Sequence, residues 1–136
     1  MNKVVFPAIL FLIFALPLQT QAKEMHHKEP KLMGVLFYAD WCGSCKTLDP
    51  LIEKARGKTG LDDMDIVFVR MDLSDNTTRA QSAMLASSLG IGDIFARNDG
   101  KTGYMALIDT DTKEIVGKID KSMKADEISS LIKQKL

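Results

Sequence analysis

Cysteine is scarce in this sequence, whose 136 residues include only two, Cys42 and Cys45, within the run Cys-Gly-Ser-Cys. A structural disulfide stabilises most when it closes a long loop, because the entropy it removes from the unfolded chain grows with loop length. A bridge across two residues removes little entropy. The chain is also long enough to bury one core without covalent staples, so its stability does not require this pair.

Net charge is lacking as well, because 18 Lys and Arg residues balance 18 Asp and Glu residues. This balance argues against binding to nucleic acid or to an anionic membrane surface, both of which need a basic patch. Partners must therefore be recognised by shape and local chemistry. The sequence also has no histidine after His27 and no proline after Pro50.

The first residues have the pattern of a secretory signal peptide. Lys3 precedes an apolar run over residues 4–18, which is shorter than the roughly 20 residues of a spanning helix. Thr20 and Ala22 occupy the two small-residue positions of a signal peptidase site. We expect cleavage of residues 1–22, no stable membrane insertion afterwards, and a periplasmic mature protein; an uncleaved anchor is the alternative.

A polar arm, residues 23–30, leads into one predicted α/β domain, residues 31–136. The predicted strands cover residues 32–38, 65–71, 104–108 and 114–119, and the predicted helices cover 42–57, 76–89 and 128–136. The first two strands are expected to be buried and parallel, joined by a helical crossover, and the last two to form an antiparallel hairpin. The result is a mixed central sheet flanked by helices. Residues 90–103 are predicted as a loop whose Ile94 and Phe95 cover or extend the site.

The segment Phe37-Tyr-Ala-Asp-Trp-Cys-Gly-Ser-Cys-Lys46 resembles the active site of thioredoxins. Its Tyr-Ala-Asp-Trp-Cys part resembles in particular the C-terminal domain of bacterial transmembrane thiol reductases of the DsbD type. Pro50 stands where thioredoxins carry a helix-kinking proline. The resemblance implies a thioredoxin-like fold and a periplasmic thiol-disulfide oxidoreductase, favours the reductase direction, and calls for no cofactor and no metal.

Thiol-disulfide exchange requires a thiolate, and the positive end of a helix dipole favours that anion at the first helical position. Cys42 is therefore the predicted nucleophile, and Cys45, one turn further in, is the predicted resolving cysteine. The predicted supporting residues are Trp41, Gly43, Ser44 and Thr102. By analogy with redox relatives, Gly43 and Ser44 tune the reduction potential. Trp41 is expected to shield the disulfide and contact partners, which is compatible with its packing against the edge of the sheet.

Two positions depart from the thioredoxin pattern. Leu36 stands six residues before Cys42, where thioredoxins have a buried acid that helps to move a proton. Lys101-Thr102-Gly103 stands where they have a cis-proline before a strand, and we expect Thr102 to be its equivalent. Disulfide chemistry is therefore better supported by the sequence than substrate docking.

The expected partners are exported proteins with thiols or disulfides, and a membrane thiol reductase as electron donor. Two alternatives remain open. A thioredoxin-like metal-binding or copper-assembly protein could use the Cys-x-x-Cys pair, although the only histidines, His26 and His27, lie on the polar arm. A non-catalytic interaction domain could carry the pair as a structural disulfide.

Overall fold

The computed structural model describes residues 29–98 and 100–136. Its strands are β1 (Leu32–Tyr38), β2 (Ile66–Asp72), β3 (Tyr104–Asp109) and β4 (Ile115–Asp120). Its helices are α1 (Gly43–Thr59), α2 (Asn76–Ser88), α3 (Gly92–Asn98) and α4 (Ala125–Lys135), with a 3₁₀ turn at Leu61–Asp63. The predicted signal peptide and most of the polar arm, His26 and His27 included, lie outside the described residues.

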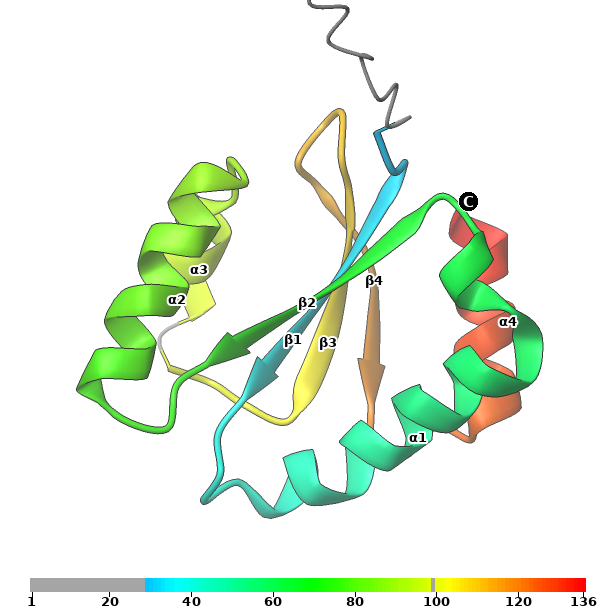
Figure 1. Ribbon diagram of the computed structural model, residues 1–136, viewed down its shortest axis with the longest axis horizontal. Helices are drawn as coiled ribbons and strands as arrows, with labels where there is room; N and C mark the ends of the chain where they lie inside the picture. Colours follow the sequence, from blue (N-terminus) through cyan, green and yellow to red (C-terminus); the bar gives the residue numbers. More distant parts are fainter. Residues whose placement is uncertain (1–28, 99) are drawn as a thin grey trace, which may run out of the picture.

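The strands form one sheet in the order β2-β1-β3-β4. β1 pairs with β2 in parallel and with β3 antiparallel, and β3 pairs antiparallel with β4. Helices α1 and α4 cover one face of this sheet, and α2 and α3 cover the other (Figure 1). The predicted α/β architecture, with a mixed sheet between helices and β1 at its centre, is confirmed.

The alternating side chains of β1 fill two separate cores. Leu32 and Leu36 belong to the core beneath α1 and α4, whereas Val35 and Phe37 belong to the core beneath α2 and α3. Because both faces are covered, a strand at this place must be apolar at every position, which is why the run has no polar alternation. β1 is thereby held rigidly, with its C-terminal end leading into the cysteine motif.

Two predictions about the other face and the edge of the sheet were wrong. β2 is an edge strand, and Val67 on it is 38% exposed, so it is not buried on both faces. Residues 92–98, predicted as part of a loop, form α3. Ile94 is buried against the core beneath α2 and α3, and Phe95 packs beside it with its ring 6.4 Å from that of Phe37. These two side chains therefore belong to the core rather than to a cover over the cysteines.

Across residues 29–98 and 100–136, no helix combines the length and the hydrophobicity that crossing a bilayer demands.

Candidate functional site

The turn between β1 and α1 places Cys42 at the N-terminus of the helix. The Cys42 amide donates to the carbonyl of Ala39 at 3.1 Å, which closes the turn. Cys42 has extended backbone angles (φ −83°, ψ 108°) and is the N-cap of α1, and its sulfur accepts a hydrogen bond from the Cys45 amide at 3.2 Å. A residue at this position normally offers an oxygen to the free amides of the first turn; here the acceptor is sulfur.

The two cysteines differ slightly in their access to solvent. Cys42 retains 8% of its surface, whereas Cys45 retains none. Both thiols are free, and the Cys45 thiol points to the Phe37 carbonyl at 3.8 Å. Cys42 is thus the sulfur that an outside group can reach, and Cys45 lies directly behind it.

The surroundings shift the two thiol pKa values in opposite directions. Burial raises the pKa of Cys42, but hydrogen bonds from the Cys45 thiol, the Thr102 hydroxyl and the amides of Cys45 and Ser44 outweigh it, so the pKa of Cys42 lies below its ordinary value. Burial, and then the neighbouring Cys42 sulfur, raise the pKa of Cys45. Cys42 therefore forms the thiolate more readily, and Cys45 stays protonated to a higher pH.

The segment before β3 packs directly onto the cysteine ring. The Gly103 amide donates to the Phe37 carbonyl at 2.9 Å, and the backbone there has φ +86°. A Cβ at Gly103 would lie 2.7 Å from Ser44 Cβ and 3.3 Å from Cys42 Sγ. Glycine is thus required twice, for its conformation and for the close approach. The residue immediately ahead of β3 is Gly103, while Thr102 offers its hydroxyl to Cys42.

Trp41 faces solvent on the rim of the site and is 61% exposed. Its indole nitrogen donates to the carbonyl of Ser74 at 3.1 Å, and the preceding Asp40 amide donates to the Ser74 hydroxyl at 2.9 Å. Ser74 was not among the site residues predicted from the sequence. Gly43 is also exposed, and a Cβ there would meet nothing within 4 Å.

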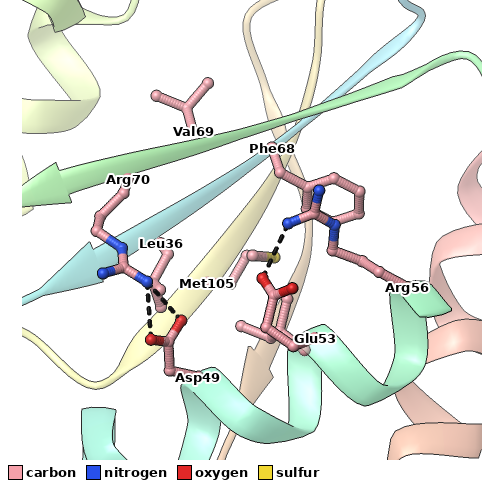
Figure 2. Close-up of a pocket in the computed structure, with 9 residues that line it drawn as sticks. Leu36, Asp49, Glu53, Arg56, Phe68, Val69, Arg70 and Met105 are labelled. Atoms are coloured by element: carbon pink, nitrogen blue, oxygen red, sulfur yellow. Dashed lines mark hydrogen bonds and ion pairs between the residues drawn. The ribbon is translucent and has the colours of Figure 1, made fainter. Parts of the chain in front are cut away.

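Leu36 is 4% exposed and lines a pocket of about 90 Å³ between α1 and the sheet. The charged groups of this pocket turn toward one another at its mouth (Figure 2). Arg70 donates to both carboxylate oxygens of Asp49 at 2.7 Å, and Arg56 pairs with Glu53 at 2.9 Å. Leu36, which stands where thioredoxins carry an acid, therefore lies in the apolar core beneath α1 and α4, and the charged residues that line the pocket pair with each other.

Within the part of the chain that the structure describes, no three His, Cys, Asp or Glu side chains gather as ligands for a metal ion.

The thioredoxin family model matches residues 18–133. A protein disulfide-isomerase of Oryctolagus cuniculus is 41% identical over 58 residues, which are 43% of this chain and 11% of that protein. Thioredoxin-2 of Saccharomyces cerevisiae is 37% identical over 57 residues, which are 42% of this chain and 51% of that protein. The matched segment thus spans at most about half of these curated relatives. A candidate protein disulfide isomerase from Bacteroides thetaiotaomicron superposes with a TM-score of 0.50 at 26% identity, covering 78% of this chain and 72% of that one.

Proposed function

This chain belongs to the thioredoxin family, and from that premise we propose that it is an exported thiol-disulfide oxidoreductase that reduces disulfides in other exported proteins. The observation that carries the proposal is the pair of sulfurs at the start of α1. One is reachable and favours the thiolate, and the other is buried directly behind it and holds its proton.

This asymmetry supports an ordered exchange. The Cys42 thiolate attacks one sulfur of a partner disulfide, forming a Cys42–partner bond and releasing the other partner sulfur as a thiolate. The Cys45 thiol then loses its proton and attacks Cys42 Sγ, which forms the Cys42–Cys45 disulfide and releases the second partner sulfur. Two electrons have passed to the partner, and an external dithiol returns them to this chain.

The exported setting and the reductase direction rest on the sequence. The pattern of residues 1–22 favours export, and the Tyr-Ala-Asp-Trp-Cys segment resembles the reductase domains of DsbD-type proteins. A membrane thiol reductase is accordingly the proposed electron donor, and periplasmic proteins with disulfides are the proposed substrates.

Substitution Cys45→Ala tests the central step. With no resolving sulfur, mixed disulfides through Cys42 should accumulate in cells and appear as bands of higher mass that dithiothreitol removes. Cys42→Ala is the matched control and should give none. If Cys45→Ala captures no exported protein while the wild-type chain is processed and abundant, the proposed function is wrong.

The redox equilibrium of the pair against glutathione tests the direction. Family potentials run from about −270 mV for reductants to about −120 mV for oxidants, and the proposed direction requires a value toward the reducing end. A potential below about −300 mV, together with no reduction of insulin, would instead indicate a structural disulfide. Metal content after purification tests the metal-binding alternative in the same sample.

A further inference from the structure

Ser74 ties together the two loops that follow β1 and β2. Its hydroxyl accepts from the Asp40 amide at 2.9 Å and donates to Asp72 Oδ1 at 2.5 Å, and its carbonyl accepts the Trp41 indole at 3.1 Å. The Asp40 N–H occupies one lone pair of the hydroxyl oxygen, so the hydroxyl hydrogen is directed to the carboxylate. Ser74 therefore holds the Trp41 turn through two separate contacts.

The anchor beneath Ser74 is itself fixed. The Ser74 amide donates to the same Asp72 oxygen at 2.8 Å, and the Ser82 hydroxyl from α2 donates to the Asp72 carbonyl at 2.9 Å. The next residue, Asp75, caps α2 by accepting from the Thr78 amide at 2.9 Å. Whatever bonds to Ser74 is thus held against the end of β2 and the start of α2.

The chain contains a second copy of the same local motif. Asp120 Oδ1 accepts from the Ser122 amide at 2.9 Å and from the Ser122 hydroxyl at 2.5 Å, which matches the Asp72–Ser74 geometry. Only Ser74, of the two, also bonds to the loop that carries Cys42. The additional contacts, and not the turn itself, distinguish Ser74.

Trp41 needs such a tie because little else covers it. Most of its surface is open to solvent, on the residue directly before the reactive Cys42. A large flat ring held in one orientation contacts a partner without the entropy cost of immobilising it on binding. A loose ring would incur that cost each time a partner bound.

We propose that Ser74 is a positioning residue, which fixes the Trp41 indole beside Cys42 as a contact surface for the partner protein. The part of this inference that concerns partners rests on the proposed function. Ser74 touches neither sulfur; it acts through the Asp40–Trp41 turn.

Trp41 is the single tryptophan of the chain, so tryptophan fluorescence reports on this ring alone. Time-resolved anisotropy should show Trp41 turning with the whole protein in the wild type and an added fast motion in Ser74→Ala, which keeps the carbonyl that accepts from the indole but loses the hydroxyl that links the Asp40 amide to Asp72. Ser122→Ala, the matched control, should behave as wild type, and Ser74→Thr, which keeps the hydroxyl, should recover the slow motion. Identical decays for wild type and Ser74→Ala would overturn the proposal. Should Ser74→Ala not fold, Asp72→Ala provides the second variant, because it removes the oxygen that accepts from the Ser74 hydroxyl and amide; the readout and the decisive outcomes are the same.

The kinetic arm compares a protein disulfide with a small one. Ser74→Ala should raise KM for insulin about two- to tenfold, the cost of immobilising one side chain, with kcat retained and with the rate toward dithiobis(nitrobenzoate) unchanged. A fall in the rate for both substrates, with a shifted titration of Cys42, would overturn the proposal because the effect would then lie at the sulfur. A wild-type chain inactive on both disulfides would refute the proposed function, while the anisotropy of Trp41 would still decide the role of Ser74.

Discussion

Two regions near the cysteine pair differ in polarity. On the side of β3, Cys42 meets the Thr102 hydroxyl and the glycine at 103, where even one carbon atom would not fit. Beneath α1, the buried Leu36 occupies the position at which thioredoxins have an acid. Asp49 and Arg70, which line the same pocket as Leu36, form an ion pair with each other.

The pKa values of the two cysteines reflect their different surroundings. Hydrogen-bond donors on the β3 side and in the first turn of α1 stabilise the Cys42 thiolate, which is the reactive form. Cys45 is buried in a small cluster with Ala39 and Tyr38, and this burial raises the pKa of its thiol. Hydrogen bonds thus lower the pKa of Cys42, the predicted nucleophile, whereas burial raises the pKa of Cys45, the predicted resolving cysteine.

The largest expected effect comes from placing a carboxylate on the apolar side. Leu36→Asp removes buried apolar contacts and buries an acid, which should lower the free energy of unfolding by about 3–5 kcal/mol. Burial should raise the pKa of that new carboxyl, so the loss should be smaller below about pH 4, where both folded and unfolded states are protonated, and should grow as the pH rises. Urea unfolding from pH 4 to 8 measures this.

Leu36→Asn is the matched control for that variant, because it is polar but does not ionise and should lose stability to the same extent at each pH. If Leu36→Asp also resolves mixed disulfides faster than Leu36→Asn, the apolar side limits proton loss from Cys45. Equal resolution rates would mean that water or another group already serves.

An intermediate effect is expected from adding one carbon atom on the β3 side. Gly103→Ala forces a side chain onto a left-handed backbone and against Ser44, which should cost about 2 kcal/mol of stability. Gly57→Ala in α1, where a Cβ would meet nothing within 4 Å, is the control and should stabilise by about 0.5–1 kcal/mol. Chemical denaturation of both variants in the reduced state makes the comparison, and an unaffected Gly103→Ala would show that this contact is not tight.

The smallest expected effect is on reactivity. Thr102→Val keeps the shape of Thr102 but removes its hydrogen bond, so the pKa of Cys42 should rise toward its ordinary value. Alkylation of Cys42 by iodoacetamide at pH 6 should then slow about three- to tenfold, whereas Thr102→Ser should react like the wild type. Mass spectrometry identifies the alkylated sulfur. An unchanged rate would leave the backbone amides as the source of activation.

The lowered pKa of Cys42 also determines how the stability of the reduced protein depends on pH. Folding lowers the pKa of Cys42, so its thiolate stabilises the fold above the usual thiol pKa, and this contribution is lost as the pH falls through the folded value. The raised pKa of Cys45 acts in the reverse sense. In Thr102→Val, the gain from Cys42 at alkaline pH should shrink.

The sequence predicted the centre of the fold best because local composition and final environment agree there. β1 spans the predicted residues, since a strand covered on both faces has a continuous apolar run. The Cys42–Cys45 pair could be placed because the change from strand to helix lies directly around it. The supporting roles predicted for Trp41, Gly43 and Ser44 stay predictions.

The errors arose where local pattern and environment disagree. α3 is short and begins at Gly92, two residues after Gly90, yet Ile91, Ile94 and Phe95 have helical spacing. The exposure of β2 depends on which strand lies beside it, and a local apolar run holds no information about that. Its Phe68 is instead covered by the Arg56 guanidinium, 4.7 Å from the ring centre, a contact between distant segments.

Ser74 and Gly103 were not predicted as site residues, for different reasons. Ser74 is 33 positions from the indole it binds, so only the folded chain joins them, although an Asp-x-Ser run after a strand is a recognisable turn signal. Gly103 had a usable signal, a glycine immediately before a strand. Its role could not be predicted, because only the folded structure shows that the backbone at Gly103 approaches the sulfur of Cys42.

The double pairing of β1 has a mechanical consequence. A partner joined to Cys42 would pull on the chain at the end of β1, roughly along the strand. β1 is bonded to β2 from Leu32 to Tyr38 and to β3 from Leu32 to Phe37, so the load falls on both ladders in shear. Many hydrogen bonds then share the force at once instead of opening one after another. The predicted nucleophile therefore follows a strand that is hydrogen-bonded along both edges, which would resist such a force.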